Sequence, residues 1–256
     1  MLLFCHGAGS NAATWWQQLP VFARHYTCLT MDIRCFGRSS APMTEFSLHN
    51  FTKDALAVLE HAQAEKAVVI GQSLGGMIGL RLALHHADRI CGFIACDSSL
   101  AVDHPELLRI VENRLTNTGA LSVEQRSMGR WFLSEQPALA GLYGQINRFN
   151  PSAYSVSRAE WQAAMATLVH PDSLTPVSAL SALQCPMLFL IGDADPFVPV
   201  PIMQELAAKI PSCKTVVIEQ AGHSAYFERP DAFNRHVLAF LESHIPKDAW
   251  SPEAEA

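Results

Sequence analysis

The sequence predicts an α/β fold in which a mostly parallel sheet is flanked by helices and carries an inserted all-helical cap. Short apolar runs alternate with amphipathic stretches at both ends of the chain, as in a parallel sheet covered by crossover helices. Between about residues 100 and 179 this alternation stops, and only helical apolar spacing remains. We therefore expect a core formed by residues 1–99 and 180–256, with a helical cap at residues 100–179.

Composition limits the function classes to which the chain can belong. The chain has 256 residues, of which 49% are hydrophobic, so it can bury one large core with an inserted subdomain. A formal net charge of −6 and the lack of a basic run argue against nucleic-acid and anionic-membrane partners. No apolar stretch is long enough to span a bilayer. A small neutral or anionic substrate is compatible with this composition, and self-association into a homo-oligomer is left open.

The start of the chain and its cysteines favour a cytoplasmic protein. Residues 1–5 lack the basic region of a secretory signal and lead directly into His6-Gly7, which is typical of a core strand. The seven cysteines form no C-x-x-C pair, and most of them lie in apolar, strand-like runs. We expect them to be small buried side chains in a reducing compartment.

The elements before the cap follow from the alternation of apolar runs and amphipathic stretches. Short β-rich runs predict strands at residues 2–5, 27–31, 67–71 and 90–96. Amphipathic spacing between these runs predicts helices at residues 12–24, 46–63 and 75–87.

The cap and the second part of the core are predicted in the same way. Helical apolar spacing marks residues 105–108, 123–133 and 159–168, and no strand-like run is found between residues 100 and 179. Strand-like runs return at residues 185–192 and 215–218, followed by a last helix near residues 231–244. We expect the cap to lie over the strand ends, where open α/β sheets bind their ligands.

The turn after the first strand, Gly7-Ala8-Gly9-Ser10-Asn11-Ala12, has two interpretations. It fits the G-x-G-x-x-G/A turn of dinucleotide-binding proteins, and Asp32 follows at about the distance expected of a ribose-binding carboxylate. It also fits the His-Gly loop of esterases, in which a backbone N–H group faces an oxyanion. Both uses need exposed amides where a strand gives way to a helix, so the turn alone does not decide between them.

The strongest motif is Gly71-Gln72-Ser73-Leu74-Gly75, which lies between an apolar strand and a helical pattern. A nucleophilic serine must sit on a strained turn that lifts its side chain above the sheet, and bulky residues in place of Gly71 or Gly75 would collide with the returning chain. Ser73 would then stand at a helix N-terminus, where the Leu74 amide can donate to a developing negative charge.

A serine nucleophile needs a base and an orienting carboxylate. In this strand-turn-helix context the expected chain order is Ser, then Asp or Glu, then His. Asp193 and Asp195 follow one β-rich strand, and His223 follows the next. The position of His223 after the strand is what singles it out, because it is one of 11 histidines.

These residues belong to a set of segments that together resemble the α/β-hydrolase superfamily. The segments, in the order typical of the family, are HGAGS (6–10), MDIRCFGRS (31–39), GQSLGG (71–76), GDADPFVP (192–199) and GHSAYFERPDAFN (222–234). The resemblance implies that Ser73 is the nucleophile, His223 the base and Asp195 its partner, because the family pattern is Gly-x-x-Asp with a proline four residues later. It also implies that the Ala8 and Leu74 amides form the oxyanion hole. Asp193 is then a turn residue, and the dinucleotide interpretation leaves the Ser, Asp and His segments unexplained.

The sequence departs from the family pattern at two places. Members usually have two further strands before the His-Gly strand, so the sheet is expected to lack them unless the sequence lacks its natural start. Cys35 occupies a position that is generally glycine in the family. We interpret it as a local turn variant, and a reactive role for its thiol is the alternative.

The resemblance implies a serine hydrolase of a small ester, lactone or related acyl substrate, with no cofactor and no metal. There is no H-E-x-x-H motif and no Cys/His ligand cluster. Carbon–carbon bond hydrolysis of ring-cleavage products is an alternative, ranked second because Ser224, rather than an aromatic residue, follows His223. A non-catalytic small-ligand receptor is the alternative from another class, because fold does not imply function.

Candidate substrate contacts in the cap fall into two groups, each with packing or surface exposure as the alternative. Aromatic residues that could line an apolar acyl pocket are Trp131, Phe132, Tyr143, Phe149, Tyr154 and Trp161. Arginines that could pair with a substrate carboxylate, as expected for an enol-lactone, are Arg130, Arg148 and Arg158.

Overall fold

The computed structural model describes residues 1–116, 121–149 and 156–245. Its main sheet has six strands, all parallel, in the order β2-β1-β3-β4-β7-β8. The strands are β1 (Leu2–Cys5), β2 (Cys28–Met31), β3 (Ala67–Gln72), β4 (Ile90–Cys96), β7 (Met187–Gly192) and β8 (Cys213–Ile218). The predicted α/β class and each predicted core strand are confirmed, with bounds within two residues.

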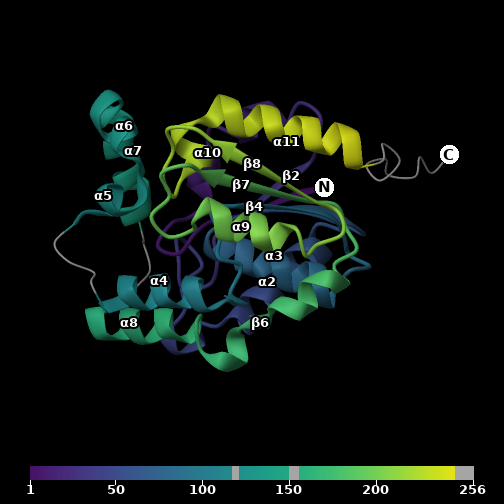
Figure 1. The fold of residues 1–256 in the computed structure, drawn as a ribbon, viewed down its shortest axis with the longest axis horizontal. Helices are drawn as coiled ribbons and strands as arrows, with labels where there is room; N and C mark the ends of the chain where they lie inside the picture. The colour runs from purple at the N-terminus through teal and green to yellow at the C-terminus, as the bar shows by residue number, and fades with distance from the viewer. Residues whose placement is uncertain (117–120, 150–155, 246–256) are drawn as a thin grey trace.

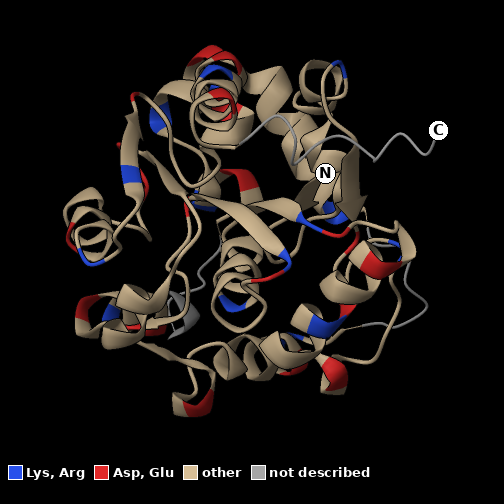
Figure 2. Cartoon of the chain, turned by 90° about the vertical axis from the view of Figure 1, so that its right-hand side faces the viewer, with Lys and Arg blue, Asp and Glu red and all other residues tan. Residues whose placement is uncertain are grey.

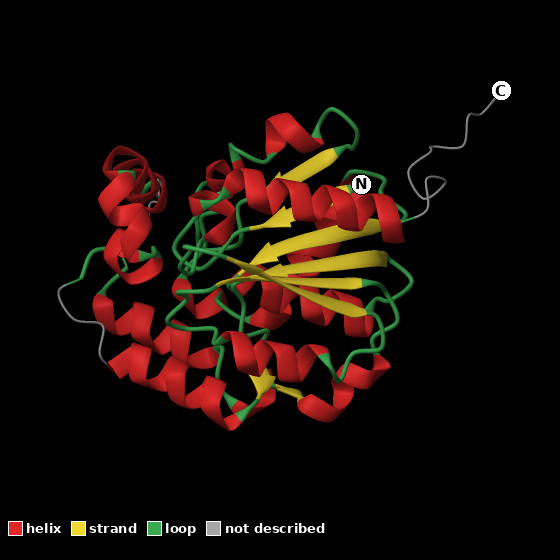
Figure 3. Cartoon of the chain, turned by 45° about the horizontal axis from the view of Figure 1, so that its top comes forward, coloured by secondary structure: helices red, strands yellow, loops and turns green. Residues whose placement is uncertain are grey.

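Alternating side chains of the strands divide the core into two layers. Leu2 and Phe4 pack with Trp15 in one buried cluster, while Leu3 and Cys5 belong to the cluster on the other face. This is the two-residue period of a strand that is covered on both faces. The strands point toward the helical insertion, so their carboxyl ends meet beneath it (Figure 1, Figure 3).

The helices outside the insertion cover the two faces of the sheet. They are α1 (Leu19–Phe22), α2 (Leu48–His61), α3 (Leu74–His85), α9 (Val200–Ala207), α10 (Ala225–Glu228) and α11 (Pro230–His244). The predicted helices at 46–63, 75–87 and 231–244 correspond to α2, α3 and α11. The helix predicted at 12–24 is wrong as a single element: a 3-10 helix (Ala12–Trp15) is followed by the separate helix α1, which has Pro20 in its first turn. Proline favours the first turn of a helix, so a new helix begins there although the apolar pattern continues.

A helical insertion lies between β4 and β7, as expected. Its helices are α4 (Pro105–Thr116), α5 (Val123–Ser127), α6 (Arg130–Glu135), α7 (Pro137–Arg148) and α8 (Arg158–Thr167). The single helix predicted at 123–133 is wrong, because Met128 and Gly129 are extended and separate α5 from α6. The expected absence of strands between 100 and 179 is also wrong: β5 (Val102–Asp103) pairs in parallel with β6 (Thr175–Pro176). The division into a core of 1–99 and 180–256 and a cap of 100–179 stays a prediction.

The surface charges are mixed in sign. Lys and Arg are interspersed with Asp and Glu along the elements seen in Figure 2. None of the described helices is both long and apolar enough to cross a membrane. Within the described ranges there is also no group of three or more His, Cys, Asp or Glu side chains that could hold a metal ion.

Candidate active site

The turn from β3 into α3 places Ser73 in a strained conformation. Ser73 has φ 50° and ψ −111°, in the left-handed half of backbone space that side chains rarely occupy. Two close backbone approaches make glycine necessary around it: a Cβ on Gly71 would lie 2.3 Å from the Gly75 carbonyl carbon, and one on Gly75 would lie 2.0 Å from the Cys5 carbonyl oxygen. The sequence therefore folds here into a tight turn that projects the Ser73 side chain above the sheet.

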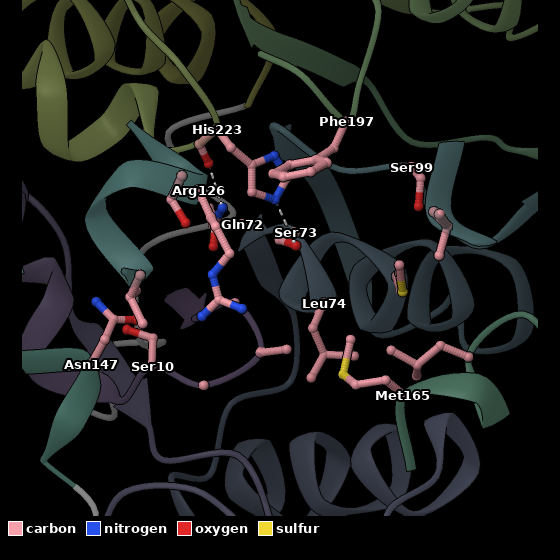
Figure 4. Close-up of a pocket in the computed structure, with 18 of the residues that line it drawn as sticks. Ser10, Gln72, Ser73, Leu74, Ser99, Arg126, Asn147, Met165, Phe197 and His223 are labelled. Atoms are coloured by element: carbon pink, nitrogen blue, oxygen red, sulfur yellow. Dashed lines mark hydrogen bonds between the residues drawn. The ribbon is translucent and has the colours of Figure 1, made fainter. Parts of the chain in front are cut away.

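His223 and Asp195 lie beside Ser73 in a continuous hydrogen-bond chain. His223 Nε2 is 3.0 Å from Ser73 Oγ, and His223 Nδ1 is 2.8 Å from Asp195 Oδ2 (Figure 4). If Nδ1–H donates to the carboxylate, the Nε2 lone pair faces the serine hydroxyl. The loops after β3, β7 and β8 thus bring together three residues that lie up to 150 positions apart in sequence.

The two candidate aspartates have different surroundings. The side chain of Asp195 is completely buried, and its second oxygen, Oδ1, accepts the N–H groups of Phe197 at 2.7 Å and Val198 at 3.2 Å. Asp193 is exposed, and its carboxylate accepts the N–H of Ala221 at 3.2 Å, away from the imidazole. Only Asp195 is therefore placed to orient His223.

Ala8 and Leu74 line the same pocket as Ser73. Neither N–H group has a hydrogen-bond partner among the described residues. Leu74 is the first residue of α3, where the N–H is unpaired by the helix itself. These two groups can donate to a negative oxygen held beside Ser73.

The buried ring of His6 holds the turn that carries Ala8. Its Nδ1 lies 2.8 Å from the Gly7 carbonyl, and its Nε2 accepts the N–H of Ile33 at 2.9 Å. Burial lowers the pKa of His6 to about 4, so the ring is neutral at pH 7, as both hydrogen bonds require.

The dinucleotide interpretation of this turn does not fit the structure. The carboxylate of Asp32 accepts the N–H groups of Ala12 at 2.7 Å and Arg38 at 2.9 Å, so it serves the loop rather than a ribose. The glycine turn leads into a four-residue 3-10 helix rather than an α-helix that could seat a pyrophosphate.

Two polar residues that the sequence did not single out, Gln72 and Asp97, support the His223 loop. Gln72 donates to the His223 carbonyl at 2.7 Å. Asp97, at the end of β4, accepts the N–H groups of Gly192 and Ala225, both at 2.8 Å. Burial and the nearby charge of Asp195 raise the pKa of Asp97. An acidic residue directly after a buried strand was the signal that could have identified it.

The insertion is fastened to the same loop. The backbone N–H of His223 donates to the Ser127 carbonyl at 2.6 Å, which links the His223 backbone to the end of α5. The buried carboxylate of Glu228 accepts Gly129 N–H at 2.8 Å and Gly222 N–H at 2.9 Å, and burial raises the pKa of Glu228 to about 8. These hydrogen bonds therefore couple the position of α5 to the position of the His223 backbone.

A cavity of about 260 Å³ opens above Ser73, between the strand ends and the insertion. Apolar side chains line one part of it, and polar side chains line another. The apolar lining residues are Leu74, Met77, Val111, Val123, Trp161, Met165, Leu168, Val169, Phe197 and Val198. The polar ones, apart from Ser73 and His223, are Ser10, Gln72, Ser99, Arg126, Ser127, Tyr143 and Asn147.

Some of the aromatic residues expected to contact the substrate line this cavity, and others do not. Tyr143 and Trp161 line it, whereas Trp131, Phe132 and Phe149 do not, and Tyr154 lies outside the described residues. Phe132 is buried and packs against Phe227 instead.

The arginines that the sequence suggested also lie elsewhere. Arg130, Arg148 and Arg158 are absent from the lining, and Arg148 pairs with Glu124 at 3.1 Å. Among the described residues, the arginine that lines the cavity is Arg126, on α5, which no sequence pattern singled out.

Cys35 adopts the backbone conformation that explains the glycine usual at its position. Its φ is +73°, and its side chain is buried. Burial raises the pKa of the Cys35 thiol to about 11, so almost none of it is the reactive thiolate at pH 7. The geometry thus agrees with a turn variant rather than a reactive cysteine.

Comparisons with known proteins agree with this arrangement. Residues 1–230 match the family described as alpha/beta hydrolase fold. The chain is 25% identical over 245 residues to 3-oxoadipate enol-lactonase 2 of Acinetobacter baylyi, covering 94% of this chain and 88% of that protein. It is 25% identical over 249 residues to the pimeloyl-[acyl-carrier protein] methyl ester esterase of Vibrio vulnificus, covering 93% of each. A solved structure of an N-acyl homoserine lactone degrading enzyme is 28% identical, with a TM-score of 0.78 over 93% of this chain and 92% of that one.

Proposed function

Because the chain belongs to the α/β-hydrolase fold family, we propose that it is a serine hydrolase that cleaves a small carboxylic ester or lactone through an acyl-enzyme on Ser73. The observation that carries this proposal is the hydrogen-bond chain Ser73–His223–Asp195 at the floor of the cavity. A hydroxyl is a weak nucleophile by itself, and this chain supplies both a base and a carboxylate that orients the base.

In the acylation step, Ser73 Oγ attacks the carbonyl carbon while His223 Nε2 takes the hydroxyl proton. The imidazolium that forms is stabilised by the Asp195 carboxylate, whose position is set by the N–H groups of Phe197 and Val198. The carbonyl oxygen becomes an oxyanion, to which the Ala8 and Leu74 N–H groups donate.

Collapse of the tetrahedral intermediate expels the leaving alkoxide, which takes the proton from His223 Nε2–H. For a lactone, that alkoxide stays attached to the acyl chain. Water then attacks the Ser73 ester with His223 again as the base, and the released acid restores the free enzyme.

The cavity and the relatives support a small substrate. A volume of about 260 Å³ has room for a compact acyl group rather than a long lipid chain. The relatives' names include an enol-lactonase and a methyl ester esterase, and one structure is described as an enzyme that degrades a homoserine lactone. We therefore rank ester and lactone hydrolysis together, with residues 100–179 as the cap that selects among substrates.

The test is a panel of purified substrates assayed with the wild type and with Ser73→Ala. The panel contains short aryl and methyl esters, five-membered lactones, thioesters and vinylogous diketones. We expect turnover of esters or lactones and a loss on the order of 10³-fold or more in Ser73→Ala. Turnover of diketones alone would replace ester cleavage with carbon–carbon cleavage. Stoichiometric ligand binding without turnover of any substrate would favour the receptor alternative.

A further inference from the structure

The cavity above Ser73 contains a cation that none of the described acidic residues neutralises. Arg126 lines the cavity from α5, and among the described residues it forms no ion pair. Its Nε atom is completely buried and has no hydrogen-bond partner in the part of the chain that the structure describes. A buried donor without an acceptor is costly, which points to an acceptor that arrives with a ligand.

Two further polar groups lie on the same side of the cavity. In Figure 4, Ser10 and Asn147 lie on the side of Ser73 toward which the Arg126 guanidinium extends, and Leu74 and Met165 lie on the opposite side. The Ser10 hydroxyl is buried and also lacks a described partner. The turn that carries Ser10 is attached to α7 through Asn11, whose amide donates to the Ile146 carbonyl at 2.7 Å.

The electrostatic balance of the cavity is positive on this side. No Asp or Glu is among the described residues that line it. The acidic group closest to the chemistry, Asp195, is fully buried behind His223, and both of its oxygens already accept hydrogen bonds. Glu124, on the same helix as Arg126, pairs with Arg148 through Oε1; its Oε2 is buried without a hydrogen-bond partner among the described residues, and neither oxygen forms an ion pair with Arg126. Arg126 is thus not neutralised by any of these groups.

We propose that Arg126, assisted by Ser10 and Asn147, is a carboxylate-binding subsite, and that the preferred substrate is an ester or lactone with a free carboxylate. A guanidinium offers parallel N–H donors that match the two oxygens of a carboxylate. The apolar side then holds the hydrocarbon part of the substrate. This inference rests on the proposed function, because it assigns the substrate class of the same site.

The kinetic test compares a para-nitrophenyl half-ester of glutaric or adipic acid with a neutral para-nitrophenyl ester of equal chain length. The measured quantity is the ratio of kcat/KM for the anionic ester to kcat/KM for the neutral ester. We expect the wild type to prefer the anionic ester, and Arg126→Gln to lower this ratio by about 10- to 100-fold, the usual range for a lost hydrogen bond to a charged group. Arg126→Lys keeps the positive charge but lacks the parallel N–H donors of the guanidinium, so it should give an intermediate ratio.

Arg130→Gln is the matched control, because Arg130 is an exposed arginine on the neighbouring helix and does not line the cavity. It should leave the ratio unchanged. Equal ratios in the wild type and Arg126→Gln would overturn the subsite, and so would an equal decrease of the ratio in Arg126→Gln and Arg130→Gln. Turnover of the neutral ester would still support the proposed function in either case.

A binding measurement separates the two proposals if no ester is turned over. Glutarate and adipate are titrated calorimetrically into Ser73→Ala and into the double variant Ser73→Ala/Arg126→Gln. Saturable binding that is lost with Arg126 supports the subsite. Binding that is absent from Ser73→Ala, or equal in the two proteins, contradicts it.

Discussion

Replacing Asp195 by asparagine should impair the enzyme chiefly by fixing His223 in the wrong tautomer. In the wild type, Asp195 Oδ1 accepts two backbone N–H groups, from Phe197 and Val198, and Oδ2 faces His223 Nδ1. In Asp195→Asn the amide oxygen will keep the two N–H donors, so its NH₂ group will face Nδ1. That arrangement makes Nδ1 an acceptor and puts the ring proton on Nε2, where it blocks proton transfer from Ser73.

The magnitude follows from the cost of leaving this arrangement. Turning the amide so that its oxygen faces His223 places NH₂ against two N–H groups, and two such lost bonds cost about 3 kcal/mol, or roughly 10²-fold in population. Replacing a charged acceptor by a neutral one removes a further ~2–3 kcal/mol of imidazolium stabilisation. Together we expect kcat/KM for an activated aryl ester to fall by about 10⁴-fold.

Steady-state hydrolysis and thermal unfolding, measured on the same samples, test this reasoning. Asp195→Asn should keep a melting temperature close to that of the wild type, because the two backbone hydrogen bonds persist. Asp193→Asn is the control, since Asp193 is exposed and lies away from His223; its kcat/KM should change less than about threefold. If Asp195→Asn retained a tenth of the wild-type rate, or if Asp193→Asn were the worse variant, the assigned role of Asp195 would be refuted.

Three further predictions concern the turn after β1 and the strand-helix turn. Ala8→Pro removes one oxyanion donor and should lower kcat by about 10² to 10³-fold, whereas Ala8→Ser keeps the donor and should retain most activity; equal rates in an ester assay would remove Ala8 from the oxyanion hole. Gly75→Ala places a Cβ 2.0 Å from the Cys5 carbonyl oxygen and should lower the free energy of unfolding by about 3 kcal/mol or more, so a loss below about 0.5 kcal/mol in urea titration would contradict the close approach. Burial lowers the folded-state pKa of His6 from 6.5 to about 4, so the stability contributed by its neutral ring is present above pH 6.5 and is lost as pH falls toward 4. This loss amounts to about 3 kcal/mol, and urea titrations at pH 7 and pH 4 should show a smaller decrease for His6→Gln than for the wild type; equal decreases would refute it.

The core strands and the approximate positions of α2, α3 and α11 could be predicted because the local sequence of each element carries a clear pattern. The strands are uninterrupted apolar runs, and the helices have regular amphipathic spacing. Residues 12–24 were mispredicted because Pro20 starts a new helix within an apolar pattern. Residues 123–133 were mispredicted because Gly129 leaves the helix to donate to Glu228, a partner 99 positions away.

The same distinction applies to the candidate site. Ser73, Asp195 and His223 stand at strand ends with motif residues around them, so their positions could be stated from the sequence. The roles of Gln72, Asp97 and Glu228 depend on backbone groups that approach only in the folded chain. The composition of the cap suggested several arginines, but which one enters the cavity depends on how α5 is oriented over Ser73. Local sequence does not encode that orientation.

The most direct measurement of the central claim is covalent trapping of the nucleophile. The wild type is incubated with a para-nitrophenyl alkylphosphonate ester, and the adduct is located by intact-mass and peptide-fragment mass spectrometry. We predict one phosphonyl group per chain, attached to Ser73, release of one equivalent of nitrophenol and complete loss of ester turnover, with no adduct on Ser73→Ala. An adduct on another serine of the cavity, such as Ser99, or full ester turnover by Ser73→Ala, would contradict the assignment of Ser73 as the nucleophile.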